Sequence, residues 1–304
     1  MIRQPAVAGR FYPGEPAALA HEVDSFLAPS EAPIGAAREV VRDAAHEVAR
    51  DVSRAASREA PRSAARDLAP RAAIACMVPH AGYMYSGHVA GAVFARLDLP
   101  ERFIIVGPRH YPRGAAMAIL SDGVWRTPLG DAPLDAALAA DLRRACPLLR
   151  EDAVAHEHEH SLEVQLPFLQ RRAGEFHFVP VVLGTIRFED LEALGRAIAK
   201  VIAAASERVM LIASSDMNHY ESEAITHVKD HKALERVLAL DPRGLLETVL
   251  REKISMCGVG PMVSVLIAAR ELGATHAELV RYATSGDVSG DRDEVVGYAG
   301  VIIN

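Results

Sequence analysis

Apolar positions along the chain fall into two patterns that alternate. Short runs consist almost wholly of Val, Ile, Leu, Ala and Phe, which is typical of strands covered on both faces of a sheet. These predicted strands span residues 74–78, 103–106, 117–120, 176–183, 209–213, 277–282 and 295–303. Between them, apolar residues recur with the period of a helix over residues 16–27, 86–97, 133–144, 161–171, 188–205, 221–240, 242–251 and 261–272.

Strands that alternate with helices of this length predict an α/β fold with helices on both faces of the sheet. We therefore expect a three-layer α/β/α sandwich around a mixed, mostly parallel β-sheet. The chain shows no internal repeat and no second change of composition, so residues 1–304 are predicted to form a single domain.

One segment, residues 31–72, differs in composition from the rest. It is mostly Ala, Arg, Glu and Asp, has no aromatic residue, and repeats arginine every four positions from Arg50 to Arg66. Two interpretations remain open: a surface helix with a weak apolar face, or a charged insertion without stable structure. Either way, the segment is predicted to be a surface insertion within the domain.

Composition excludes several classes of function. The net charge of −7 argues against a dedicated nucleic-acid binder, which needs a basic surface. No apolar run approaches the roughly 20 residues that cross a bilayer, and the N-terminus lacks the apolar core of a signal peptide. Three cysteines (Cys76, Cys146 and Cys257) are too few for a disulfide framework. We therefore expect a cytoplasmic globular protein without nucleic-acid or membrane partners.

Histidines follow directly after several predicted strands. His80 follows the strand at 74–78, His110 follows the strand at 103–106, and His219 follows the strand at 209–213. In open α/β sheets, ligands bind in the crevice beyond the carboxyl ends of the strands. If these strands are parallel neighbours, the three histidines converge there.

His80 and His110 are two candidate metal ligands, and Cys257 is the best candidate for a third. Gly258 and Gly260 allow the backbone near Cys257 to approach closely, and the helix that Pro261 begins can lower the pKa of the thiol. A thiolate beside two imidazoles suits Cu, Zn or Fe rather than Mg or Ca. The alternative is that each histidine is an ordinary hydrogen-bonded residue and the cysteine a small apolar one.

The tract at residues 156–160 alternates histidine and glutamate. Such a tract can bind metal or form a solvated loop. His160 and Glu163 lie nearest the start of the next helix and are predicted to line the site. His156 and His158 are predicted to lie on the surface.

Asp216 and His219 form a candidate pair for proton chemistry. A carboxylate can fix the tautomer of an imidazole and raise its basicity. The alternative, that Asp216 caps the following helix, stays open.

Seven short motifs contain these candidate residues or lie between them. They are residues 8–13 (AGRFYP), 79–83 (PHAGY), 107–110 (GPRH), 125–130 (WRTPLG), 159–163 (EHSLE), 214–219 (SSDMNH) and 256–261 (MCGVGP). They span nearly the whole chain except the insertion at 31–72. In this order they resemble the Memo family, called AmmeMemoRadiSam system protein B in bacteria.

This family is similar to the class III extradiol dioxygenases, whose Fe(II) is held by two histidines and a glutamate. The resemblance implies the dioxygenase-like fold, with His80 and His110 as metal ligands and Cys257 in the place of the carboxylate. It also implies that His219 acts as an acid or base and that His160 lines the pocket. Because a thiolate changes the charge and redox properties of the metal, ring-cleaving activity does not follow from the resemblance.

Three functions of different class are consistent with these residues. The first is a metal-dependent redox enzyme that uses Fe(II), or Cu as the alternative, on a small aromatic molecule. The second is a metal-binding or redox-buffering protein without turnover. The third is a protein that binds a peptide or a partner, and the resemblance implies a radical-SAM protein and an AMMECR-type protein in the same pathway.

Overall fold

A computed structural model describes residues 1–28 and 72–304, so the predicted insertion at 31–72 lies, apart from Ala72, outside the described residues. Within the described residues, nine strands form the main sheet, with four parallel strands at its centre. In spatial order these four are β2 (Ala75–Val78), β9 (Val209–Ser214), β3 (Arg102–Pro108) and β8 (His177–Leu183).

Antiparallel and short strands complete the sheet on both sides. β12 (Val295–Ile303) pairs antiparallel with β2 and also with β10 (His219–Glu221) and β11 (Ala277–Thr284). At the other edge, β4 (Met117–Ile119) is antiparallel to β8 and parallel to β7 (Arg150–Glu151). The sheet is therefore mixed, as predicted, with its parallel part in the middle.

Alternating side chains of the central strands pack into two separate cores. In β3, Ile104 and Val106 join one core, whereas Phe103 and Ile105 join the core on the opposite face. This explains why the strand sequence is apolar at every position. The helices over the first face are α4 (Ala136–Ala145), α6 (Phe188–Ala204), α7 (Glu223–Leu238), α8 (Pro242–Arg251) and α9 (Val259–Glu271). Those over the second are α1 (Pro16–Leu27), α3 (Tyr83–Phe94) and α5 (Leu166–Arg172).

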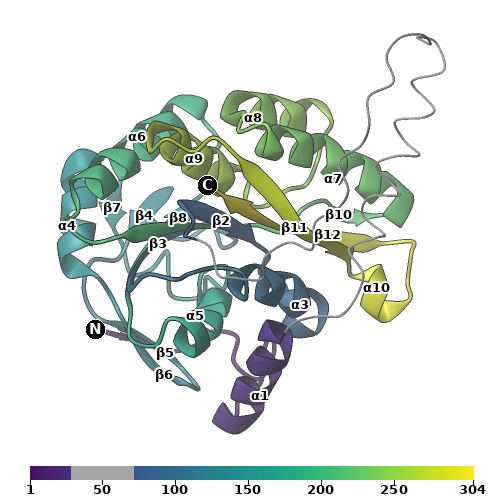
Figure 1. Ribbon diagram of the computed structural model, residues 1–304, viewed down its shortest axis with the longest axis horizontal. Coiled ribbons are helices and arrows are strands. Elements are labelled where there is room, and N and C mark those ends of the chain that lie inside the picture. The colour runs from purple at the N-terminus through teal and green to yellow at the C-terminus, as the bar shows by residue number, and fades with distance from the viewer. Residues whose placement is uncertain (29–71) are drawn as a thin grey trace, which may run out of the picture.

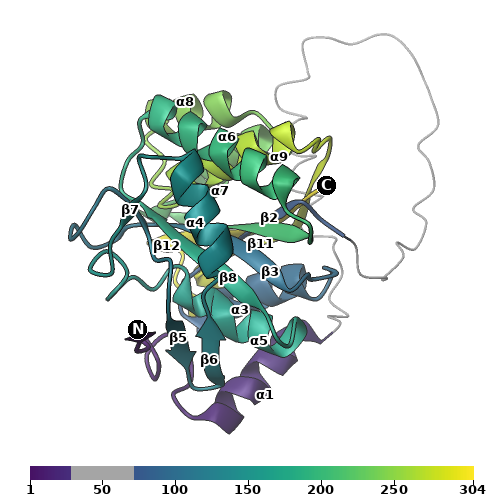
Figure 2. The same cartoon turned by 90° about the vertical axis from the view of Figure 1, so that its left-hand side faces the viewer.

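The two helical layers are visible on either side of the sheet (Figures 1 and 2), which confirms the predicted three-layer architecture. Local sequence sets the ends of several helices. Asp241 precedes α8 and accepts a hydrogen bond from the backbone N–H of Gly244, and Asp135 does the same for Leu138 in α4. No helix among the described residues is long and apolar enough to cross a bilayer.

A small second sheet was not expected from the sequence. It consists of β1 (Ile2–Arg3), β5 (Val124–Thr127) and β6 (Gly130–Pro133). β1 pairs in parallel with β5, and the guanidinium of Arg3 lies 4.1 Å from the centre of the Trp125 ring. The Arg3 side chain also donates to the carbonyls of His156 and Glu159, which ties the N-terminal segment to the loop that carries His160.

Candidate metal centre

Three histidine rings meet at the carboxyl ends of the central parallel strands. His80 follows β2, His110 follows β3, and His160 lies in the loop before the 3-10 helix η2 (Glu163–Gln165). One ring nitrogen of each can be chosen so that all three lie within 4.8 Å of one another. The ring centres are 5.1 Å apart for His80 and His110, 5.6 Å for His80 and His160, and 4.5 Å for His110 and His160. Because β9 separates β2 from β3 in the sheet, the cluster lies over the end of β9.

The hydroxyl of Ser214, at the end of β9, determines which nitrogen of His80 carries the proton. Ser214 Oγ donates its single hydrogen to the Ser161 carbonyl, at 2.6 Å, and accepts from Nε2 of Gln165, at 3.0 Å. His80 Nδ1 lies 2.9 Å from the same hydroxyl. Since a carbonyl can only accept and an amide nitrogen only donates, Nδ1 of His80 must be the donor. Its Nε2 therefore carries a free lone pair.

Glu159 holds the ring of His110 in the same way. His110 Nδ1 lies 2.8 Å from Oε1 of Glu159, and the backbone N–H of His110 donates to Oε2 at 2.7 Å. The backbone N–H of Ser161 adds a third hydrogen bond, to Oε1, at 2.8 Å. A carboxylate that fixes Nδ1–H leaves Nε2 of His110 available as a ligand atom.

Burial and charge set the protonation of the cluster. Burial and the neighbouring His110 hold the pKa of His80 well below its usual range. Burial and His80 lower the pKa of His160 to about 4. Burial opposes ionisation of Glu159, but its hydrogen bonds with His110 outweigh this effect and lower its pKa to about 2. The same carboxylate raises the pKa of His110 against the effect of burial. At neutral pH the site therefore contains neutral His80, neutral His160 and an ionised Glu159.

His160 has an unsatisfied nitrogen. Its Nδ1 is buried, has no hydrogen-bond partner among the described residues, and lies 3.7 Å from Oε1 of Glu159. The ring packs edge-on against Phe11, with ring centres 4.8 Å apart. A buried nitrogen without a partner costs free energy, so this arrangement fits a ligand atom that a metal ion would satisfy. His160 was predicted to line the pocket, and the structure places it within the cluster.

Cys257 lies directly beside the cluster, in the segment that precedes α9. Its Sγ is 3.2 Å from Nε2 of His80 and accepts from the backbone N–H of Asp216 at 3.3 Å. Burial and the charge of Asp216 raise the pKa of the thiol well above its usual value, so the expected lowering by the helix that follows Cys257 was wrong. Without a metal, the protonated thiol therefore donates to the free lone pair of His80. Displacement of that proton would make both atoms available as metal ligands.

Asp216 and His219 lie at the same end of β9 but have separate hydrogen-bond partners. Asp216 Oδ1 accepts from the backbone N–H of His80 at 2.7 Å, and burial raises the pKa of this carboxyl. His219 Nδ1 lies 3.0 Å from the Ser255 carbonyl. The tautomer of His219 is thus set by a backbone carbonyl, and its Nε2 can accept a proton.

Glu163, which was predicted to line the site, and His156 are both buried, and neither side chain bonds to a histidine of the cluster. The Glu163 carboxylate accepts from Arg3 at 2.5 Å, from Tyr12 at 2.6 Å, and from two backbone N–H groups. His156 was predicted to lie on the surface, and this was wrong: it is fully buried, with Nδ1 bonded to the Asp152 carbonyl at 2.8 Å. The adjacent His158 is exposed, as predicted.

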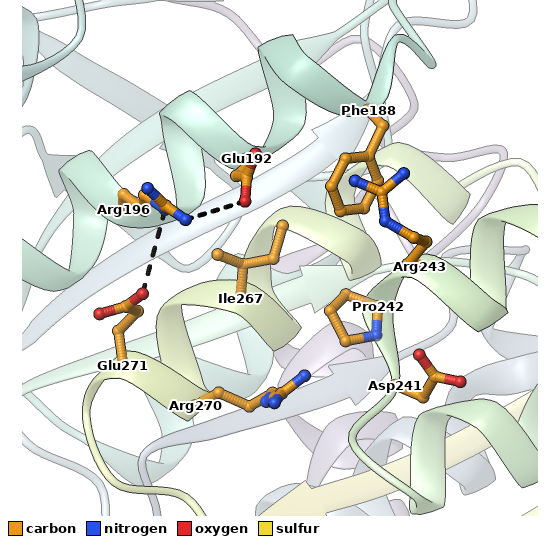
Figure 3. A pocket seen from close by; sticks show the side chains of 9 residues that line it. All are labelled: Phe188, Glu192, Arg196, Asp241, Pro242, Arg243, Ile267, Arg270 and Glu271. Carbon is orange, nitrogen blue, oxygen red and sulfur yellow. Dashed lines mark hydrogen bonds and ion pairs between the residues drawn. The ribbon is translucent and has the colours of Figure 1, made fainter.

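A hollow of about 510 Å³ lies away from the histidine cluster, between α6, α8 and α9 (Figure 3). Its side chains include three arginines and three acidic residues. Arg196 pairs with Glu192 at 3.0 Å and Glu271 at 4.0 Å, and Arg243 stacks on Phe188. Because these charges balance within the wall and no ligand of the cluster lines it, the hollow is not part of the candidate site.

Sequence reasoning missed the groups that orient the ligands. The role of Glu159 was not predicted because Glu159 lies in a tract that alternates histidine and glutamate. Its position immediately before His160 could have indicated that role. Ser214 begins one of the seven motifs, but its role and that of Gln165 could not be inferred from the sequence, because both depend on contacts between segments far apart in the chain.

Fold and cluster together define an α/β protein with a candidate metal centre of three histidines at the carboxyl ends of parallel strands. The chain belongs to the Memo family: the family model described as Memo-like protein matches residues 43–302. The membership expected from the sequence motifs is confirmed.

Relatives match nearly the whole chain. A MEMO1 family protein of Methanopyrus kandleri is 39% identical over 310 residues, which cover 99% of each chain. One of Pyrobaculum aerophilum is 43% identical over 233 residues, covering 76% of this chain and 83% of its own. Among solved structures, an uncharacterized protein of Escherichia coli K12 aligns with a TM-score of 0.49 and 15% identity, over 74% of this chain and 98% of its own.

Proposed function

We propose that this protein binds one transition-metal ion at the histidine cluster and uses it in redox chemistry. The observation that carries the proposal is the convergence of three imidazoles, two of which have Nδ1 fixed by neighbours. A metal ligand histidine is ordinarily held in this way by a carboxylate, a carbonyl or another polar group. The residues that would hold the ion are His80, His110 and His160, with the Cys257 thiol beside His80 as a further donor.

The donor set supports Fe(II), with Cu as the alternative. Imidazole suits both metals, whereas Mg and Ca prefer oxygen ligands. When bound, such an ion supplies one-electron redox chemistry and polarises a ligand that occupies an open position.

The chain's own residues supply the remaining roles. His219 would accept or return a proton at Nε2, because its Nδ1–H is engaged by the Ser255 carbonyl. The buried Asp216 carboxyl would orient the His80 backbone through its hydrogen bond and, near the thiol, disfavour a free thiolate. Phe11 would cover one side of His160 and restrict access of water.

The proposal is tested by metal content and affinity under anaerobic, reducing conditions. We expect about one Fe or Cu per chain in the wild type, and loss of that ion in His80→Ala and in Cys257→Ser. His158→Gln is the matched control, since this exposed histidine belongs to the same tract and contacts none of the ligands. Retention of wild-type affinity by folded His80→Ala would refute the site.

A second measurement separates redox chemistry from simple metal binding. Oxygen uptake by the metal-loaded protein with small aromatic compounds is expected to fall in His219→Gln, while metal content stays unchanged. Binding without any oxygen uptake would reduce the proposal to a metal-binding protein without turnover.

A further inference from the structure

A second pair of histidines lies one helical turn apart on α7. The rings of His227 and His231 are nearly parallel, at 18°, with centres 6.4 Å apart. Both contact the ring of Tyr282 in β11, at 5.2 and 6.0 Å between ring centres. An i, i+4 spacing places two imidazoles on the same helix face, as in helical metal-binding motifs.

Each of the two rings has a nitrogen lone pair available. His231 Nδ1 lies 2.9 Å from the His227 carbonyl, which can only accept, so Nδ1 carries the proton and Nε2 is free. The ring of His227 has no hydrogen bond to any of the described residues. Both side chains are partly exposed, so an ion can reach them from solvent.

Nearby charge favours a cation at this face. Glu223 lies one turn before His227, and its contacts with Thr284 and Arg292 are both made through Oε1. Asp287 is a second carboxylate whose charge, like that of Glu223, raises the pKa of His227 against the effect of burial. Arg292 offsets part of this negative charge, so the ion would depend mainly on the two imidazoles.

We infer that His227 and His231 form a second metal site, which binds a late first-row divalent cation such as Ni²⁺, Cu²⁺ or Zn²⁺. Imidazole nitrogen is a preferred ligand of all three ions, and water would complete their coordination. Since metal–nitrogen bonds are about 2.0–2.1 Å for zinc, binding requires the rings to turn so that both Nε2 atoms approach one ion. The site is independent of the histidine cluster and of the function proposed for it.

Equilibrium titration of the full chain with Ni²⁺ tests the inference. We expect the ion at α7 to bind at least about tenfold more weakly in His227→Gln and in His231→Gln than in the wild type, because each variant lacks one of the two protein ligands. His21→Gln is the matched control: this exposed histidine lies on helix α1 and has no histidine four positions away. It is expected to bind as the wild type does.

The α7 ion is also expected to remain in His110→Ala, which disrupts only the other cluster. Circular dichroism would verify that each variant is folded, and the two α7 variants serve as checks on each other. Wild-type stoichiometry and affinity in both folded variants would overturn the inference. So would an equal loss in His21→Gln, because that would indicate nonspecific binding to surface histidines.

Discussion

The buried carboxylate of Glu159 bonds both the ring and the backbone of His110, at 2.8 Å to Nδ1 and 2.7 Å to the backbone nitrogen. These two contacts fix the orientation of the ring as well as its tautomer. The same carboxylate accepts from the Ser161 backbone, so it joins the end of β3 to the loop that carries His160. One side chain therefore positions two members of the cluster.

Glu159→Gln is expected to weaken metal binding by about 10- to 100-fold, the usual effect of removing a hydrogen-bond partner of a ligand histidine. The amide lacks the charge that holds Nδ1–H of His110 in place. A competition assay with a chromogenic chelator measures the change. Glu157→Gln is the control, since Glu157 is exposed in the same tract and its side chain lies 3.7 Å from Arg113. Equal affinities for the two variants would contradict the assigned role.

Ser214→Ala is expected to weaken metal binding and also to destabilise the fold. The hydroxyl accepts from His80 and Gln165 and donates to Ser161, so its removal leaves buried polar groups without partners. Such groups cost about 1–3 kcal/mol. His80 would then be free to adopt the other tautomer, with its proton on Nε2.

Ser264→Ala is the matched control for this change. Ser264 is buried in α9, and its hydroxyl has no hydrogen-bond partner among the described residues. Chemical denaturation and metal titration of both variants are expected to show lower stability and weaker metal binding only for Ser214→Ala. The tautomer argument fails if Ser214→Ala binds metal as tightly as the wild type.

Much of the fold could be predicted, because its central elements are long and strongly patterned. The strands that became β3 and β8 are nearly continuous apolar runs. The helices α1 and α8 have a helical period of apolar residues and a proline in the first turn. The small sheet could not be predicted in this way. Its strands have two to four residues, which is too short for alternation to be detected.

The candidate site was predictable only where it depends on strand order. His80 and His110 meet because the ends of parallel strands share one edge of a sheet. The wrong prediction for His156 has a different origin. A tract of alternating histidine and glutamate is polar in sequence, yet His156 is buried against Trp125 while His158 two residues later is exposed. The contact with Trp125 in β5, which is distant in the sequence, determines that His156 rather than His158 is buried.

Glu163→Gln is expected to destabilise the protein by about 3–5 kcal/mol, the range for removing one partner of a buried ion pair. Arg3 and Glu163 are both buried, and the change leaves the guanidinium without its carboxylate. Urea denaturation measures the loss. Asp131→Asn, which removes a surface ion pair with Arg126, is expected to have little effect. Similar unfolding midpoints for the two variants would show that the Arg3 network contributes little.

Asp230 in α7 is a buried carboxyl whose ionisation opposes folding. Its oxygens accept from the Asn218 backbone and from the Tyr282 hydroxyl, each at 2.8 Å. Burial nevertheless raises its pKa from 3.8 to about 7, with Glu221 adding to the rise and Lys229 opposing it. Between these two pKa values, the folded protein holds a proton that the unfolded chain has released.

The contribution of Asp230 to stability is therefore full below about pH 4 and declines as the pH rises to about 7. By linkage, the total loss is on the order of 4 kcal/mol. Asp230→Asn keeps a side-chain oxygen that accepts hydrogen bonds but cannot ionise, so its free energy of unfolding should lack this decline. The measurement is the free energy of unfolding in urea of both proteins from pH 4 to pH 8. The difference between the two proteins at each pH cancels the titration of all other groups. A difference that stays constant across this range would show that Asp230 is already ionised in the folded protein at pH 4.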